Sequence, residues 1–118
     1  MTAANYDITI EQGTTWTLQM SLYTDSDNTV PWDLSGYAAD MDIRSYKESD
    51  DTLATFSTTD GSIVISGSDS NVLTVTASAS STADYSFYAG VYDLEVSKDG
   101  VVTRIIQGKV KVSMEVTR

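Results

Sequence analysis

The sequence contains no cysteine and no histidine among its 118 residues. Without cysteine, neither a disulfide framework nor a thiolate metal site can form. Without histidine, the chain also lacks the commonest general base and the commonest zinc ligand. Serine and cysteine triads in their usual forms are therefore excluded. Paired carboxylates, as in glycosidases, remain possible, but a chain of this length leaves little room for a cleft between them. We expect no cofactor and no enzymatic activity.

Long apolar runs and prolines are also scarce. No stretch approaches the roughly 18 consecutive apolar residues typical of a membrane helix, and we recognise no signal peptide. The chain has a single proline, and its many Thr, Ser, Val, Tyr and Ile residues favour strands over helices. We therefore expect a mostly β protein, made in a cytoplasm, that does not bind membranes and folds as one domain over residues 1–118.

Basic residues are few and lie mainly near the end of the chain. Seven Lys and Arg residues stand against 17 Asp and Glu residues, which gives a net charge of −10. This acidity argues against nucleic acid as a partner, because Lys and Arg supply the affinity for phosphates. Five of the seven basic residues follow residue 97. They either pair with acidic neighbours in the same molecule or form a contact strip for an acidic surface of another protein.

Apolar and polar residues alternate along several short segments, which is the pattern of half-buried strands. The clearest alternation covers residues 14–23, 37–46, 90–98 and 101–118, and shorter candidates cover 6–10, 53–57, 62–66 and 72–77. Turn residues separate these segments about every eight to twelve positions, as in sandwiches and barrels. We predict an all-β, immunoglobulin-like antiparallel β-sandwich of seven to eight strands, with one short helical turn near residues 79–87. A small closed barrel is the alternative.

The two strands near the end of the chain should form a hairpin. The Asp99-Gly100 dipeptide predicts a two-residue type I′ turn. This register places Glu95 opposite Arg104 as an ion pair, and Leu94 opposite Ile105. A three-residue turn is the competing register, and it would place Leu94 opposite Arg104.

The second of these strands is expected to continue to the last residue. Gly108 alone is too little for another turn, so it should mark a bulge or bend. The inward residues of the hairpin are predicted to be Leu94, Val96, Ile105, Val110 and Val112. The outward basic residues, which are candidates for contact with a partner, are Arg104, Lys109, Lys111 and Arg118.

Four phrases of the sequence occur together in a recognisable order. They are residues 10–16 (IEQGTTW), residues 33–37 (DLSGY) followed by 41–44 (MDIR), residues 60–63 (DGSI), and residues 91–95 (VYDLE) continuing through Gly108 to 115–118 (EVTR). This order resembles small virion proteins of tailed bacteriophages. In layout it is similar to the amino-terminal β-sandwich of phage baseplate upper proteins, which attach receptor-binding parts to the tail.

The resemblance implies a non-enzymatic structural or adaptor component of a tailed-phage virion. Its station would be the baseplate, the attachment of a tail fibre, the neck or a decoration of the head. It would bind other virion proteins, in part by adding strands at sheet edges, and it would be a homo-oligomer in the assembled particle. Trp32 follows Pro31 where a smaller residue would be more usual, so it is a further candidate for partner contact.

A carbohydrate-binding module that serves host attachment is the alternative function. Exposed aromatic rings can stack on sugar rings, and several aromatic residues lie near predicted loops: Tyr23, Trp32, Tyr46, Tyr85 and Tyr88. Tyrosine also commonly sits at sandwich edges with its hydroxyl in water, so the aromatic residues alone do not decide between the two functions.

Overall fold

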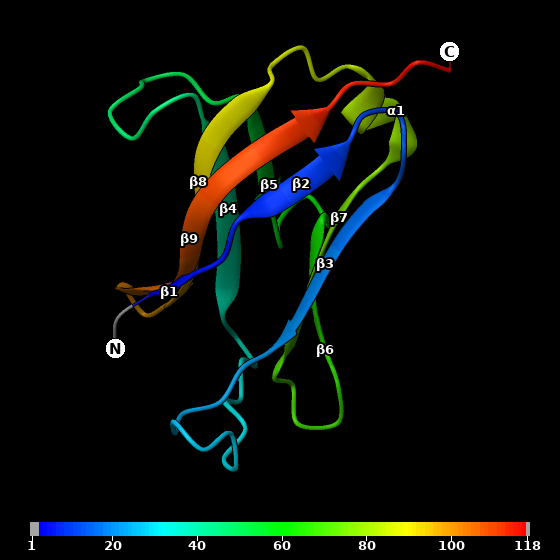
Figure 1. Cartoon of the computed structure of the whole chain (residues 1–118). Helices are drawn as coiled ribbons and strands as arrows, with labels where there is room; N and C mark the ends of the chain where they lie inside the picture. The colour runs from blue at the N-terminus through cyan, green and yellow to red at the C-terminus, as the bar shows by residue number, and fades with distance from the viewer. Residues whose placement is uncertain (1–2, 118) are drawn as a thin grey trace.

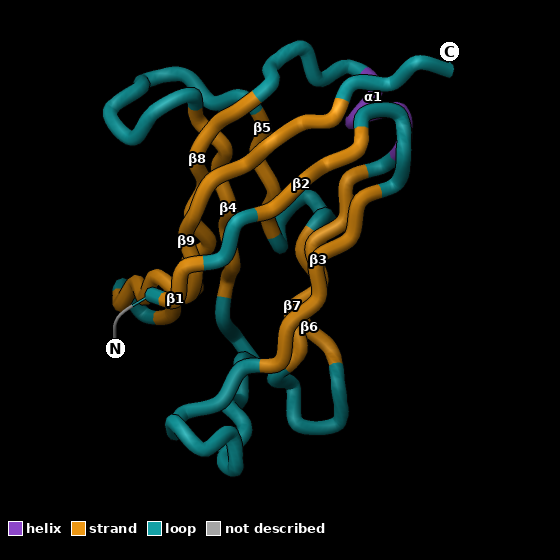
Figure 2. The backbone as a smooth tube through the Cα atoms, viewed as in Figure 1, coloured by secondary structure: helices purple, strands orange, loops and turns teal. Residues whose placement is uncertain are grey.

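The computed structural model describes residues 3–117, which form two β-sheets packed face to face (Figures 1 and 2). The larger sheet has the order β1–β9–β8–β4–β5, with β2 also paired to β9. Its strands are β1 (Ala4–Asn5), β2 (Ile8–Glu11), β4 (Ala38–Arg44), β5 (Ala54–Ser57), β8 (Ala89–Lys98) and β9 (Val101–Ser113). The smaller sheet has the order β3–β7–β6. Its strands are β3 (Trp16–Ser21), β6 (Ile63–Ser66) and β7 (Val72–Ala77).

This arrangement confirms the predicted all-β, immunoglobulin-like sandwich and not the closed barrel. One detail differs from an antiparallel sandwich, because β1 and β2 both run parallel to β9. With the two-residue β1 included, residues 3–117 contain nine strands. β8 and β9 lie in the middle of the larger sheet, since β4 flanks β8 on one side and the N-terminal strands flank β9 on the other.

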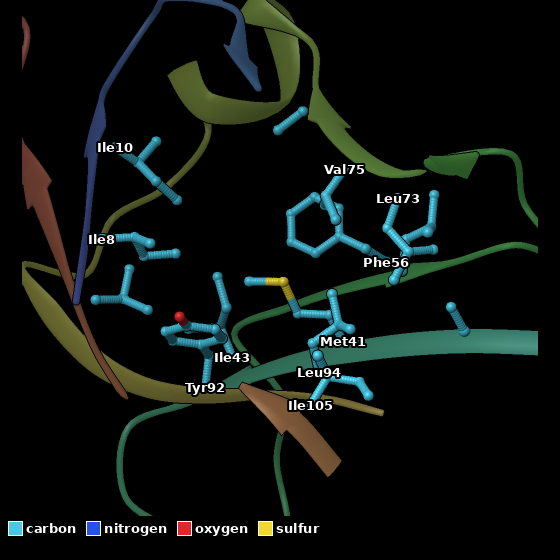
Figure 3. Packing of buried hydrophobic residues seen from close by; sticks show 14 of the residues in the cluster. Ile8, Ile10, Met41, Ile43, Phe56, Leu73, Val75, Tyr92, Leu94 and Ile105 are labelled. Atoms are coloured by element: carbon cyan, nitrogen blue, oxygen red, sulfur yellow. The ribbon is translucent and has the colours of Figure 1, made fainter. Parts of the chain in front are cut away.

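Apolar side chains from both sheets fill the space between them (Figure 3). Burial alternates along β8, where every second residue points into the core. Each fully buried aliphatic side chain contributes about 1.5–3 kcal/mol through its removal from water. The five predicted core residues of the final hairpin are all buried: Leu94, Val96, Ile105, Val110 and Val112.

The helix α1 (Ala79–Ala83) crosses one end of the sandwich and is shorter than the predicted segment. Its N-cap is Ser78, whose hydroxyl accepts a hydrogen bond from the backbone N–H of Ser81. The buried Thr82 hydroxyl donates to the carbonyl of Thr14 (2.7 Å) and accepts from the N–H of Gly13 (3.0 Å). α1 therefore holds the turn between β2 and β3. No helix within residues 3–117 has the length and apolar character needed to cross a membrane.

The hairpin between β8 and β9 has the predicted turn. Asp99 and Gly100 have positive φ angles of 53° and 83°, as a type I′ turn requires at both central positions. Lys98 faces Val101 across the turn. The two-residue register is therefore confirmed, and the three-residue alternative is wrong.

Beyond the turn, a β-bulge changes the predicted pairing. Glu95 faces Arg104 as expected, but the register shifts between Leu94 and Glu95. Leu94 consequently faces Ile106, and Ile105 is the extra residue of β9. The bulge thus lies at Ile105 and not at the predicted glycine. It allows both isoleucines to pack against the core.

The predicted continuation of the last strand is wrong, because β9 ends at Ser113. β2 ends at Glu11, which pairs with Ser113, and β8 begins at Ala89, which pairs with Lys111. Past these pairs neither neighbour of β9 continues, so the alternating residues after Ser113 have no strand to join. Val116 is 90% exposed.

Gly108 has a different role from the predicted one, because it makes room for the link between β1 and β2. A Cβ at this position would lie 2.3 Å from the carbonyl oxygen of Tyr6. Tyr92 faces Gly108 on β8 and donates its hydroxyl to the same carbonyl. Asp7 Oδ1 accepts the backbone N–H of Lys109 (2.9 Å). We call this contact between the β1–β2 link and β9 the N-terminal crossing.

Because of the N-terminal crossing, a side chain at Gly108 should destabilise the protein. Gly108→Ala forces the β1–β2 link away from β9 and should lower the free energy of unfolding by about 1–3 kcal/mol. Urea denaturation measures this change. Ser113→Ala, at the exposed end of β9, is the control and should shift stability by less than about 0.5 kcal/mol. In a chain shortened by residues 1–7 the Gly108→Ala penalty should largely disappear. An unchanged penalty would show that Tyr6 is not the obstacle.

Ionisation of the buried Tyr92 phenol should lower the stability of the protein at alkaline pH. Burial raises the pKa of Tyr92 to about 12, and negative charge at Tyr6 and Asp7 adds to this effect. An unfolded tyrosine has a pKa of about 10. The folded state therefore favours the protonated phenol of Tyr92. The contribution of this phenol to the free energy of unfolding is complete below pH about 10 and is lost as the pH rises toward about 12. Denaturation curves over this range should show a steeper loss of stability in the natural protein than in Tyr92→Phe. Equal slopes would contradict the assignment.

Candidate functional site

Most of the charged residues on the three central strands of the larger sheet point to solvent, on the side of the sheet away from the core. Alternate residues of β4, β8 and β9 point into the core, so the residues between them point to solvent. We call this exposed surface the outer face. Its charged residues are Asp40, Asp42 and Arg44 on β4, Asp93 and Glu95 on β8, and Arg104, Lys109 and Lys111 on β9.

A hollow of about 480 Å³ lies on the outer face. It spans the three central strands and reaches β1 at Asn5. Arg104 and Gln107 of β9 both line it. Most of the residues around the hollow are charged or polar, although much of the surface inside it comes from apolar atoms. Because the hollow is open, it suits protruding side chains of another protein better than a ligand that must be enclosed.

Carboxylates face one another across β4 and β8. Asp40 lies opposite Glu95, and Asp42 lies opposite Asp93. Like charges in directly opposed positions destabilise a sheet by up to about 1 kcal/mol per pair. Alternation along each strand is enough to place these acids outward, but it does not reveal that the register brings them together.

Two arginines compensate part of this repulsion. An Arg44 guanidinium nitrogen lies 3.1 Å from Asp42, as expected from their spacing on one strand. Arg104 Nε lies 3.4 Å from Asp93 Oδ2, and its guanidinium also donates to Gln107 Oε1. Arg104 therefore contacts Asp93 in place of the predicted Glu95. Both ion pairs are partly exposed to solvent, so each stabilises the fold by less than about 1 kcal/mol.

The basic residues of β9 form a row along one side of the outer face. Lys109 and Lys111 are both exposed, and neither makes a salt bridge with the part of the chain that the structure describes. Internal pairing thus accounts for Arg104 but not for these two lysines. Arg118, the fourth basic candidate, lies outside the described residues.

Trp32 is not part of this row. Its indole is half-buried and packs edge-on against Tyr37, with ring centroids 5.9 Å apart. Lys98 Nζ lies 5.4 Å from the centroid of the Tyr37 ring, which places this cluster by the turn between β8 and β9. The structure therefore brings Arg104, Lys109 and Lys111 onto one face and leaves Trp32 apart from them.

The aromatic residues considered for sugar binding differ in exposure. Tyr46 and Tyr88 are exposed, at 58% and 71%. Tyr23 and Trp32 are half-buried, and so is Tyr85, whose ring lies 5.4 Å from that of Phe87. Carbohydrate binding stays a prediction.

The acids with lowered pKa values lie in turns rather than on the outer face. Hydrogen bonds from Thr29, Ser35 and Ser62 lower the pKa values of Asp25, Asp33 and Asp60, respectively. A lowered pKa keeps a carboxyl ionised, which is the opposite of what a general acid requires. These residues stabilise local turns. Within residues 3–117, no group of three Asp or Glu side chains has the geometry to hold a metal ion.

Comparisons with known proteins support the fold. No family model and no curated protein matches the sequence. A crystal structure of a chicken T-cell receptor matches with a TM-score of 0.52 and 12% sequence identity. The match covers 94% of this chain and 54% of the receptor chain, so this chain spans about half the receptor's length. An extracellular fragment of novel immune-type receptor 11 from Ictalurus punctatus matches with a TM-score of 0.41 and 11% identity, covering 100% of this chain and 89% of that one. At such identity, the T-cell receptor match shows the immunoglobulin-like fold alone.

The facing carboxylates predict a substitution that stabilises the protein. Asp40→Asn removes one member of the Asp40–Glu95 pair and should raise the free energy of unfolding by about 0.2–1 kcal/mol at low ionic strength. High salt should reduce this gain, because it screens the repulsion. Urea denaturation at two salt concentrations measures both values. Asp50→Asn, in the exposed loop after β4, is the control for net charge. An equal gain in both variants would contradict a local effect.

Proposed function

We propose that this chain is a non-enzymatic structural adaptor of a tailed-phage virion and that it binds other virion proteins through the outer face. The observation that carries the proposal is the separation of charge on that face. Lys109 and Lys111 stand without salt-bridge partners among residues 3–117, while carboxylates face one another on the neighbouring strands. The facing carboxylates cost stability, and such costs are common where a surface serves binding.

The assignment to a phage virion rests on the sequence resemblance. Its phrases occupy architectural positions in this fold. Residues 10–16 form the end of β2, the turn held by α1 and the start of β3. In residues 33–37, Asp33 Oδ1 accepts the N–H of Ser35 and closes a tight turn before β4. The residues that resemble phage virion proteins therefore form turns and strands, which agrees with a structural role, and none of them is a catalytic group.

The charges of the outer face suggest how a partner would be recognised. A partner surface with an acidic strip opposite β9 and a basic strip opposite β4 and β8 would match it. Such complementarity accelerates association and fixes the orientation of the complex more than it raises affinity. Binding of this kind weakens as salt increases, because the charges involved are exposed.

Mass spectrometry of purified virions tests the proposed location. We expect the chain in the particle, and co-expression with the products of neighbouring genes should identify its partner. The station could be the baseplate, the attachment of a tail fibre, the neck or the head. Absence from the particle, or failure to bind any of these products, would contradict the proposal.

Charge reversal tests the outer face itself. The double variant Lys109→Glu, Lys111→Glu should raise the Kd for the partner by at least about tenfold, or ~1.4 kcal/mol, while circular dichroism stays unchanged. Lys98→Glu, which reverses a charge by the β8–β9 turn, is the control and should leave the Kd unchanged. Unfolding of the double variant would show that the lysines are structural. An unchanged Kd would exclude the outer face as the docking surface.

A further inference from the structure

Among residues 3–117, β3 is an edge strand of the smaller sheet and pairs only with β7. The strands that precede it in sequence, β1 and β2, join β9 in the other sheet. In Figure 1 β3 lies in front of β7 and β6, and the strand order β3–β7–β6 places it at the edge of the smaller sheet. The N–H of Leu22 donates to the carbonyl of Asn71 in line with the β3–β7 register. Because these bonds alternate along a strand, the backbone groups of Thr17, Gln19 and Ser21 point to the open edge.

This edge lacks the features that usually prevent strand pairing. Proteins protect sheet edges with charges, proline, bulges or very short strands. Residues 14–23 contain no charged residue, proline or glycine, and the β3–β7 register has no shift. The other edge strands are shorter: β1 has two residues, and β2, β5 and β6 have four each, whereas β3 has six. β3 is thus the longest unprotected edge among the strands of residues 3–117.

The apolar side chains of β3 are only partly covered. Trp16, Leu18 and Met20 point toward the core, yet each remains half-buried. On β7, one strand further in, Leu73 and Val75 have no exposed surface. A strand added next to β3 would place its own inward side chains beside the half-buried row and cover it.

The geometry points to β3 of a second copy of this chain as the added strand, antiparallel to the first about a two-fold axis. Each copy carries a net charge of −10, so two copies repel unless they meet where charge is absent. β3 lies in such an uncharged stretch. In addition, one strand supplies both the edge and the apolar side chains, as a self-complementary two-fold contact requires. The two small sheets would join in the order β6–β7–β3–β3–β7–β6.

Symmetry restricts the register of this pairing. Facing residues must point to the same side of the joined sheet, so one residue must face the same residue of the second copy, with the axis midway between them. An axis at Gln19 pairs Thr17 with Ser21 and Leu18 with Met20, while Trp16 faces Leu22 just beyond the end of β3. A single strand pair buries less than the roughly 1,200 Å² typical of stable complexes. The dimer should therefore be weak and depend on concentration.

This inference goes beyond the proposed function, because it concerns contact between copies and uses the sheet opposite the outer face. Pairing at β3 leaves the outer face of both copies free for other proteins. The two interactions also respond to salt in opposite ways. Salt should strengthen the β3 dimer by screening the repulsion between two acidic copies, whereas it should weaken binding to the outer face.

Single cysteines test the contact, since the natural chain has none. Gln19 and Val64 both face Thr74, Gln19 from β3 and Val64 from β6. Gln19→Cys and Val64→Cys thus place one thiol on each edge of the same sheet. Mild oxidation of the folded proteins should give a disulfide-linked dimer for Gln19→Cys and far less for Val64→Cys. Equal yields, or no dimer of Gln19→Cys, would overturn the inference.

Opposite charges at Gln19 provide a second measurement that needs no covalent bond. Gln19→Glu or Gln19→Lys alone places like charges opposite each other and should weaken self-association about two- to fivefold. An equal mixture of the two variants should restore it as a mixed dimer, which sedimentation equilibrium at high salt can measure. The pair Val64→Glu and Val64→Lys is the control and should change nothing. No difference between the mixture and the single variants would also overturn the inference.

Discussion

The close approach of the Tyr6 carbonyl oxygen to Gly108 lets the N-terminal strands pair with β9 in the larger sheet. Because the β1–β2 link occupies the space beside Gly108 and Tyr92 binds its carbonyl, the N-terminal strands join β9. The larger sheet thereby gains β1 and β2, and β9 becomes an inner strand with its basic residues on a broad face. The smaller sheet keeps three strands, and β3 remains at its edge.

The two sheets hold together without the disulfide that often connects the sheets of immunoglobulin domains. Between the sheets, Trp16 of β3 packs against Phe56 of β5, with ring centroids 5.9 Å apart. At one end, the Gln12 side chain donates to the carbonyl of Tyr85 and accepts the N–H of Glu115. Close packing and hydrogen bonds to turns therefore replace the covalent connection.

Local features of this fold could be predicted from the sequence, and features that depend on distant segments could not. The Asp99-Gly100 turn needs only the positive φ angles that those residues tolerate, and alternation about Val110 places Lys109 and Lys111 outward. The role of Gly108 depends on Tyr6, which lies at the other end of the chain. The end of β9 depends on where its neighbours end, and the facing carboxylates depend on the register of β4 against β8. The alternation of apolar and polar residues reveals neither the contacts between distant segments nor the register and length of neighbouring strands.

The parallel pairing of β2 with β9 also determines when the protein can finish folding. Ile8 pairs with Val110, and the bond between Asp7 and Lys109 spans 102 positions. Contacts between segments so far apart form late, because a long loop must close before they contribute any stability. During synthesis, the first strands must remain without partners until β9 has been made. The sandwich is therefore completed only after translation has passed its final strand.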